Sequence, residues 1–245
     1  MYKATKNLIT LLFPRKVLFK YEEKLRSIYS VFHSGNDYSC PICLKKLSRF
    51  VKSKNDDSIC PNCGSLKRNR RLWLLLDSEF LQPEMKILDF SPSRCLYRKL
   101  KKRTEFDYVS TDLSRDFIAD NQWDITRIAA PDSTFDLLIC YHVLEHVKED
   151  VLAMNELFRI LKPKGKILVQ TPFKEGDTYE NEAVISEEDR LIHFGQEDHV
   201  RIYSVLGLKE RAEKCGFIVE VRTYTHEKNQ FDLSINETIL VFSKP

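Results

Sequence analysis

Four of the seven cysteines stand in two closely spaced pairs. The run Cys40-Pro41-Ile42-Cys43 is followed, after sixteen residues, by Cys60-Pro61-Asn62-Cys63. Two residues between cysteines let one tight turn direct both thiolates to a single ion, and two such turns complete a tetrahedron with no open position. We therefore predict a structural Zn²⁺ bound by Cys40, Cys43, Cys60 and Cys63. Reduced buried cysteines without metal are the alternative, but they leave the matched Cys-Pro-x-Cys turns unexplained.

Three histidines form a second group suited to chemistry. His142 and His146 are four residues apart and follow a long apolar run, and His199 lies farther along the chain. Imidazole gains and loses a proton near neutral pH, so each histidine is a candidate general base. The other interpretation, a core histidine that completes a hydrogen bond, stays open for all three.

The hydrophobic pattern after Pro83 predicts the elements that position these residues. Strands are expected at 86–90, 108–112, 135–141, 166–171, 217–223 and 238–243, and helices at 94–102, 151–161 and 204–215. Pro163 and Gly165 end the middle helix. Alternating strands and helices indicate an α/β domain with a doubly wound, mainly parallel sheet and ligands at the carboxyl ends of its strands.

Two more helices are expected before this domain. Residues 1–32 form a basic amphipathic segment interrupted at Pro14, which either packs on the protein or contacts an anionic membrane or a partner. Residues 69–80 have apolar side chains about every four positions. Their helix begins among the bases Lys67, Arg68, Arg70 and Arg71, which a solvated basic face or a bound anion would explain.

Length and composition limit the remaining choices. The chain has 245 residues, 42% of them hydrophobic, and a formal net charge of +3. We expect a globular cytoplasmic protein without a transmembrane segment, with peripheral membrane contact through residues 1–32 left open. Cys95, Cys140 and Cys215 are expected to be free thiols. The expected domains are 1–35 for the basic segment, 36–68 for a zinc ribbon and 69–245 for the α/β domain.

Residues 135–147, FDLLICYHVLEHV, resemble the fourth-strand motif of class I S-adenosylmethionine-dependent methyltransferases of the ubiquinone-biosynthesis type, methyltransferase type 11. Residues 155–165, NELFRILKPKG, are similar to that family's helix ending in Leu-Lys-Pro-Gly-Gly. The resemblance covers about residues 86–243. It implies a Rossmann-like methyltransferase with a seven-stranded sheet, preceded here by the zinc ribbon, and S-adenosylmethionine as cofactor.

The resemblance also implies a cofactor site. Its residues are Asp89, Phe90, Ser91, Asp112, Leu113, Asp124, Ile125, Cys140 and Tyr141. Asp112 would accept the ribose hydroxyls and Asp124 the adenine amino group, although a turn or helix cap is the other interpretation of either aspartate. The family has a glycine-rich turn where this chain has Ser91-Pro92-Ser93. Only eleven residues separate Asp112 from Asp124, so the intervening helix is expected to be lost or reduced to a turn.

The sequence gives fewer indications of the methyl acceptor than of the cofactor. Residues 194–203 resemble the family's His-x-Arg-x-Tyr/Phe element, which favours His199 or His146 near the acceptor, with His142 as a third candidate. The long polar segment 172–199 is expected to cover the acceptor. The paired knuckles followed by Leu72-Trp73-Leu74 also resemble a methyltransferase subgroup near surface-polysaccharide pathways.

We therefore expect a methyltransferase directed at an oxygen of a small molecule or a saccharide. One alternative is an RNA methyltransferase that uses the ribbon to bind RNA. Tyr141-His142 stands where enzymes that clamp a flipped base have Asn/Asp-Pro-Pro-Tyr, which argues against that alternative. The other alternative is a non-catalytic scaffold with a degenerate cofactor site.

Overall fold

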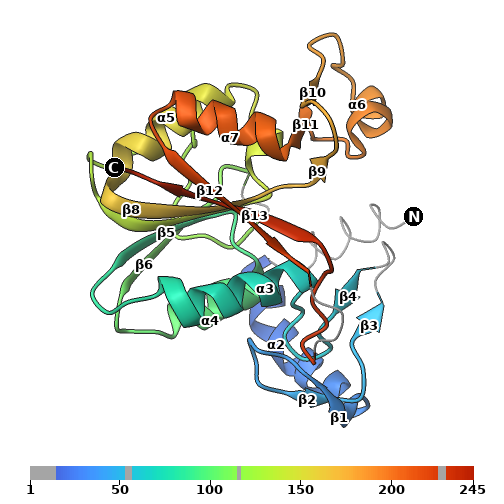
Figure 1. Ribbon diagram of the computed structural model, residues 1–245. Coiled ribbons are helices and arrows are strands. Elements are labelled where there is room, and N and C mark those ends of the chain that lie inside the picture. Colours follow the sequence, from blue (N-terminus) through green and yellow to red (C-terminus); the bar gives the residue numbers. More distant parts are fainter. Residues whose placement is uncertain (1–14, 53–56, 115–116, 226–229) are drawn as a thin grey trace. The chain divides into compact units, whose positions relative to one another are not determined.

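The computed structural model describes residues 15–52, 57–114, 117–225 and 230–245 (Figure 1). These residues divide into two compact units. The first, here called the ribbon unit, comprises the described residues within 1–80, 93–102 and 226–234. The second, the sheet unit, comprises those within 81–92, 103–225 and 235–245.

The ribbon unit combines short hairpins with helices. Its elements are α2 (Arg15–Val31), β1 (Ser34–Ser39), β2 (Lys46–Leu47), β3 (Val51–Lys52), β4 (Ser58–Ile59), α3 (Lys67–Leu75), the π-helical turn η1 (Leu76–Phe80) and α4 (Arg94–Lys101). β1 pairs with β2, and β3 pairs with β4, both antiparallel. The first cysteine pair lies between β1 and β2, and the second lies between β4 and α3. The helix expected at 69–80 is thus confirmed, although its last turn is π-helical.

The predicted N-terminal helix is described from the residue after Pro14. The part of that prediction covering residues 1–14 lies outside the described residues. On α2, Glu22 pairs with Arg94 at 3.2 Å and with Arg98 at 3.1 Å on α4. The apolar side chains of Leu25 and Ile28 are about two thirds exposed. These two residues therefore do not pack on the protein, as one interpretation of the apolar face expected. No helix in the described ranges is long and apolar enough to cross a membrane.

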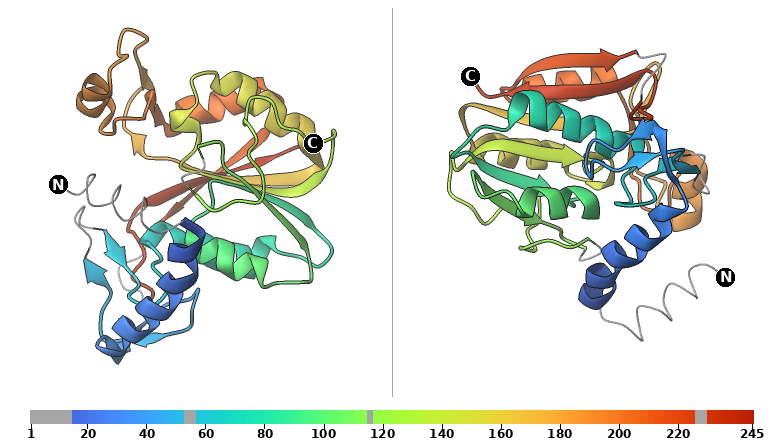
Figure 2. Two further views of the ribbon diagram at one scale, coloured as in Figure 1. Left: turned by 180° about the vertical axis from the view of Figure 1, so that it is seen from behind. Right: turned by 90° about the horizontal axis from the view of Figure 1, so that it is seen from below.

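The sheet unit is built on six strands in the order β12-β13-β8-β7-β5-β6 (Figures 1 and 2). These are β5 (Lys86–Phe90), β6 (Asp107–Thr111), β7 (Phe135–Tyr141), β8 (Leu161–Gln170), β12 (Ile218–Tyr224) and β13 (Glu237–Ser243). β5, β6, β7 and β8 are parallel, whereas β13 runs antiparallel to both β8 and β12. The mainly parallel sheet was therefore predicted correctly, and five of the six strands lie within one residue of the expected ranges. β8 begins at Leu161, five residues before the expected start, so Pro163 and Gly165 lie in the strand and not at the end of the helix.

The expected count of seven strands was wrong for the described part of the chain. The position beyond β6 holds only an isolated parallel bridge between Thr111 and Asn121. The chain then turns, because the Asp124 carboxylate accepts hydrogen bonds from the amide and the hydroxyl of Thr126. The described residues between β6 and β7 also contain no helix, as the short spacing predicted.

Two helices cover one face of this sheet. α5 (Asp150–Ile160) and α7 (Val205–Lys214) lie on the same side in Figures 1 and 2 and contact each other. Leu157 and Leu208 are buried with Leu138, Ile167 and Leu240 in one core. Complete burial of a leucine side chain contributes roughly 1.5–3 kcal/mol, so this layer holds the strand ends in place.

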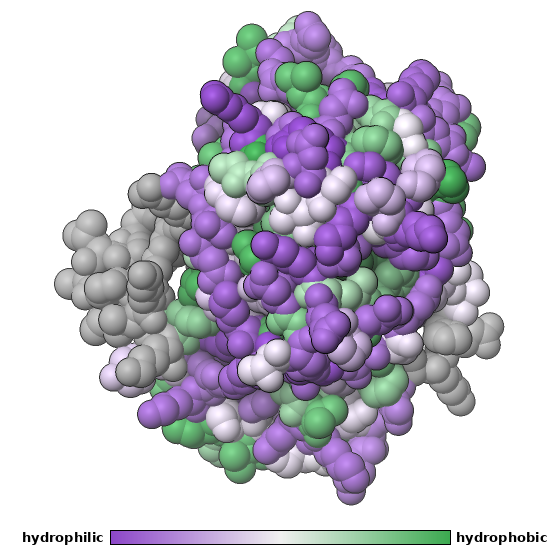
Figure 3. Space-filling model, turned by 90° about the vertical axis from the view of Figure 1, so that its left-hand side faces the viewer, coloured by the Kyte–Doolittle hydropathy of each residue, from purple (hydrophilic) through white to green (hydrophobic). Residues whose placement is uncertain are grey.

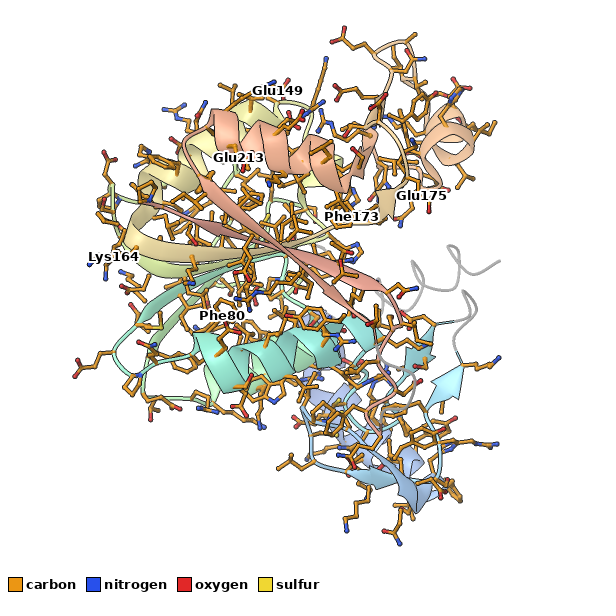
Figure 4. All side chains as sticks on the ribbon, viewed as in Figure 1. Phe80, Glu149, Lys164, Phe173, Glu175 and Glu213 are labelled. Atoms are coloured by element: carbon orange, nitrogen blue, oxygen red, sulfur yellow. The ribbon has the colours of Figure 1, made fainter. Side chains whose placement is uncertain are left out.

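A small subdomain follows β8. It contains β9 (Phe173–Lys174), β10 (Tyr179–Glu180), α6 (Glu187–Phe194) and β11 (Arg201–Ser204), with strand order β10-β11-β9. Figure 4 shows Lys164 at one end of the sheet and Phe173 at the other. The subdomain therefore begins at the end where the parallel strands finish. The long polar segment expected over the acceptor is thus a folded element.

On the face drawn in Figure 3, hydrophilic side chains predominate and apolar residues are scattered among them. Isolated exposed apolar side chains are usual on protein surfaces.

Candidate functional site

The four paired cysteines converge in the ribbon unit. Their sulfur atoms all lie within 4.8 Å of one another, with Cys40 Sγ 3.6 Å from Cys63 Sγ and Cys43 Sγ 3.7 Å from Cys60 Sγ. Sulfurs bound tetrahedrally to zinc at about 2.3 Å lie roughly 3.8 Å apart. The residues therefore fit the predicted structural Zn²⁺.

The two cysteine turns have the same backbone plan. The amide of Leu44 donates to Cys40 O at 2.8 Å, and that of Gly64 donates to Cys60 O at 2.9 Å. Both donors have a positive φ, 58° at Leu44 and 77° at Gly64. The repeated turn explains how each Cys-Pro-x-Cys sequence directs two thiols to one point.

Two arginines at the start of α3 are structural. Arg70 is 0% exposed, and its guanidinium donates to Phe231 O at 2.7 Å, Ser65 O at 2.8 Å and Asp232 O at 2.6 Å. Arg71 is also buried and donates to Ser234 O at 3.1 Å. The expectation of a solvated basic face is therefore wrong for both arginines. Their partners are distant in the sequence, which is why the charge run alone gave no sign of them.

In the sheet unit, three strand ends are level. Phe90 of β5 is opposite Thr111 of β6 and Cys140 of β7. The next residue on each strand, Ser91, Asp112 and Tyr141, therefore lies at one edge of the sheet. The strand order reverses around β5, since β6 and β7 flank it, and such a switch point is where open α/β sheets bind ligands.

Ser91 takes the backbone conformation that the missing glycine would supply. Its φ is 48°, its amide donates to Thr111 O at 2.8 Å, and its hydroxyl donates to Asp112 Oδ1 at 2.8 Å. The absence of glycine thus does not prevent the turn. The second oxygen of Asp112 accepts from the Ser114 hydroxyl at 3.0 Å and more weakly from the Phe117 amide at 3.3 Å.

Asp89, the residue before Phe90 on β5, is buried. Asp89 is 3% exposed, and the Tyr108 hydroxyl donates to its Oδ2 at 2.9 Å. Burial raises the pKa of Asp89 to about 7, against the hydrogen bond from Tyr108, which lowers it. The raised pKa favours the neutral carboxyl at Asp89.

The other predicted cofactor residues differ in accessibility. Phe90, Ile125 and Cys140 are buried in the core, and burial raises the pKa of the Cys140 thiol well above its usual value. Leu113 and Asp124 are exposed, and Tyr141 is partly exposed. Asp124 makes the turn contacts with Thr126 described above, as its alternative interpretation expected. Its role toward adenine stays a prediction.

The three candidate histidines gather around Glu145, just beyond β7. The short helix η2 (Leu144–His146) holds Glu145 and His146, and the rings of His146 and His199 are 4.7 Å apart, centroid to centroid. His142 Nδ1 lies 3.2 Å from Glu145 Oε1, and His142 has a φ of 55°. The pKa of His199 is lowered, and burial is the largest cause. For Glu145, burial works to raise the pKa, but His142 outweighs it and lowers the pKa.

Arg201, the arginine of the His-x-Arg-x-Tyr element, holds the backbone of this cluster in place. Its guanidinium donates to Leu144 O at 3.3 Å, to Lys148 O at 2.8 Å and to Val147 O. The Val200 amide donates to Glu145 O at 2.9 Å. Because His199, Arg201 and Tyr203 alternate along an extended chain, all three point inward.

A buried polar network continues from Tyr203. Its hydroxyl donates to Asp150 Oδ2 at 2.6 Å, and Arg211 donates to the same oxygen at 2.7 Å. Arg201 and Arg211 both also bind Glu180. The His-x-Arg-x-Tyr pattern thus ties the subdomain to the start of α5.

Fold and site together define a Rossmann-like class I methyltransferase: parallel strands, an antiparallel β13, and an acid after β6 at the switch point. A family model described as a methyltransferase domain matches residues 65–220, and the chain belongs to that family. A solved structure from a complex between the Haloferax volcanii Trm112 methyltransferase activator and a methyltransferase has a TM-score of 0.53 and 13% identity, covering 71% of this chain and 88% of that one. At this identity the likeness shows the fold alone.

Two curated relatives match shorter stretches. An uncharacterised protein of Methanocaldococcus jannaschii is 50% identical over 46 residues, which is 19% of this chain and 20% of that protein. A Mycolicibacterium smegmatis protein named "Probable S-adenosylmethionine-dependent methyltransferase" is 29% identical over 113 residues, 40% of this chain and 44% of that protein. The matches thus span less than half the length of either relative.

The residues at the switch point fit S-adenosylmethionine. Asp112 is an ionisable acceptor at the end of β6, fixed by Ser91, and a carboxylate can accept hydrogen bonds from both hydroxyls of a ribose. Ser91 supplies the left-handed turn that lets the backbone come close to a ligand. When bound there, the cofactor supplies a methyl group carried on a sulfonium.

Proposed function

We propose that this chain transfers the methyl group of S-adenosylmethionine to a hydroxyl oxygen of a small molecule or a saccharide. One observation carries the proposal. The turn and acid at the ends of β5 and β6 lie at the same edge of the sheet as the histidine cluster that follows β7. A cofactor site and a proton-accepting site are therefore adjacent in the fold.

The transfer itself needs little covalent chemistry from the protein. The acceptor oxygen forms a bond to the methyl carbon as the bond from that carbon to sulfur breaks, and S-adenosylhomocysteine leaves. The hydroxyl proton passes to a histidine of the cluster. In such an in-line displacement the protein contributes mainly by alignment and exclusion of water, and a base is required because a hydroxyl is a weak nucleophile.

Named residues have separate tasks in this proposal. Asp112, held by Ser91, orients the cofactor through its ribose. His146 and His199 face the acceptor, and burial, which lowers the pKa of His199, favours the neutral imidazole that a general base requires. The subdomain with α6 closes over the acceptor.

The burial of Arg70 and Arg71 weakens the RNA alternative. Arg70 and Arg71 donate to backbone carbonyls inside the ribbon unit, so they do not present their charge to phosphates. With these two arginines buried, the basic cluster at the start of α3 presents less charge to a phosphate backbone than the sequence suggests. We therefore assign the ribbon a structural role.

The test is a transfer assay with S-adenosylmethionine labelled in its methyl group. The acceptors are pools of saccharides, nucleotide sugars, small hydroxylated metabolites and RNA. We expect label in a base-stable methyl ether of a saccharide or small molecule, and loss of transfer in Asp112→Asn. Asp107→Asn, at the opposite end of β6, is the matched control. Label found only in RNA, or in no acceptor while the cofactor binds, contradicts the proposed acceptor class.

A further inference from the structure

Glu145, His146 and His199 bring three metal-binding side chains to one point. One ligand atom from each lies within 4.8 Å of the other two. Ligands that bind one ion at about 2.0–2.2 Å are roughly 3–4 Å apart, so small rotations of the side chains complete the geometry. The group is separate from the four cysteines, which lie in the ribbon unit.

The hydrogen bond of the His146 ring leaves its other nitrogen available for a metal. His146 Nδ1 lies 3.2 Å from Asp198 O, so the proton belongs on Nδ1 and the lone pair on Nε2. A metal-bound histidine usually donates its other N–H to a carbonyl or carboxylate in this way. The ring of His199 lies edge to face against that of His146, with centroids 4.7 Å apart.

The carboxylate of Glu145 lacks the partners that a buried anion requires. The residue is 1% exposed, and neither of its side-chain oxygens makes a hydrogen bond within the described residues. Among the described residues its ion-pair partner is His142, whose Nδ1 lies 3.2 Å from Oε1. Burying an ionised carboxylate is costly unless charge and hydrogen bonds compensate it. A cation at this point supplies that compensation.

The backbone around the group is rigid. Arg201 donates to the carbonyl oxygens of Leu144, in η2, and of Val147 and Lys148, just after it, and the Val200 amide donates to Glu145 O. These contacts fix His199 against Glu145 and His146, as a metal site requires of its supporting residues.

We propose that Glu145, His146 and His199 bind one divalent metal ion. Two imidazoles and one carboxylate suit Mn²⁺, Fe²⁺, Co²⁺ or Zn²⁺, and three protein ligands leave coordination positions open. Under the proposed function, the ligand for those positions is an acceptor hydroxyl. The cation lowers the pKa of that hydroxyl, and its proton then passes to water instead of to His146 or His199.

The experiment uses the full chain with its cysteines loaded with zinc, and Mn²⁺ as the probe. Binding is followed by electron paramagnetic resonance of free Mn²⁺, and zinc is counted in the same samples. We expect one Mn²⁺ per chain with no loss of zinc. Glu145→Gln and His199→Asn should weaken Mn²⁺ binding at least roughly 10- to 100-fold. His193→Ala, an exposed histidine on α6, should bind as the wild type does.

Two outcomes overturn the site. One is no bound Mn²⁺ in zinc-loaded wild type at about 1 mM Mn²⁺. The other is unchanged affinity in folded Glu145→Gln. Water-proton relaxation by bound Mn²⁺ should also reveal exchangeable water, and its absence would contradict the open positions.

Calorimetry with S-adenosylmethionine on the same samples separates this proposal from the proposed function. Cofactor binding without Mn²⁺ binding removes only the metal site. Mn²⁺ binding without cofactor binding supports the metal site and contradicts the methyltransferase activity.

Discussion

The hydroxyl of Ser91 donates a 2.8 Å hydrogen bond to Asp112, joining the ends of β5 and β6 at the edge where the cofactor is proposed to bind. Ser91 makes this bond from a left-handed conformation, with φ at 48°. One residue therefore combines two tasks: it turns the backbone as glycine would, and it holds the acid that orients the ribose. The two contributions can be separated by substitution.

Ser91→Ala removes the hydrogen bond to Asp112. The alanine still has a Cβ, so the conformational cost of a positive φ remains. We expect the free energy of unfolding to fall by about 1–2 kcal/mol. Ser91→Gly loses the same bond but relieves the conformational cost, so it should be more stable than Ser91→Ala by about 1 kcal/mol. Denaturant unfolding of both variants checks this, and equal stability of the two would show that the backbone at Ser91 is unstrained.

Zinc is expected to hold the ribbon unit together. Cys60→Ser, or a strong chelator, should release zinc and open residues 36–68 to proteolysis, because a closed cysteine site contributes its binding free energy to folding. Zinc content and the cleavage pattern are the measurements. Cys215→Ser, which changes a thiol outside the cluster, is the control and should retain its zinc. Retention of the full zinc content by Cys60→Ser would rule out the assigned ligand set.

Arg70→Ala should destabilise the ribbon unit by about 3 kcal/mol or more, because it leaves the buried carbonyls of Ser65, Phe231 and Asp232 without their donor. Lys67→Ala, at the first residue of α3, should change stability by less than about 0.5 kcal/mol. Thermal unfolding of zinc-loaded protein compares them. Similar melting temperatures would mean that Arg70 is dispensable. A test of RNA binding should accordingly neutralise only Lys67 and Arg68, since changes at Arg70 also unfold the unit.

The raised pKa of Asp89, about 7 against an ordinary value of 3.8, predicts a pH dependence of stability. The folded state binds the proton more tightly than the unfolded state, so this carboxyl lowers the free energy of unfolding as pH rises from about 4 to 7. Above pH 7 the effect is constant. Asp89→Asn has no carboxyl to titrate, so its free energy of unfolding should not fall in this way. The difference between the variant and wild type should therefore increase from pH 4 to pH 7, by at most about 4 kcal/mol. Denaturant unfolding without cofactor from pH 4 to 8 measures the difference. A difference that does not vary with pH would contradict the raised pKa.

Much of the fold was predictable because strands and helices are local patterns. The expected ranges for β5 and β7 agree with the structure at both ends, since each is a short segment of mainly apolar residues. The glycine positions were harder to interpret. Ser91 and Lys164 stand where the family has glycine. Both residues have a side chain but still adopt the positive φ that glycine favours, 48° at Ser91 and 64° at Lys164. Their conformations depend on bonds to Thr111 and Lys244, which exist only once distant strands pair.

The site was predictable in its parts and less so in its arrangement. The cysteine spacing was sufficient to place four thiols together, and the resemblance located Asp112. Arg70 was taken for a surface charge because its partners at 231 and 232 are far away in the sequence. Glu145 was quoted within a motif but not singled out, because one acid beside a histidine forms no pattern. Only the folded chain brings His199 to it.

The most direct test of the central claim is calorimetric titration of zinc-loaded protein with S-adenosylmethionine, comparing wild type with Asp112→Asn and with Asp107→Asn. We predict micromolar binding by wild type and Asp107→Asn, and binding weakened at least tenfold, or about 1.4 kcal/mol, in Asp112→Asn. No binding by folded, zinc-loaded wild type, or equal affinity in all three proteins, would contradict the assignment of this edge of the sheet as a cofactor site.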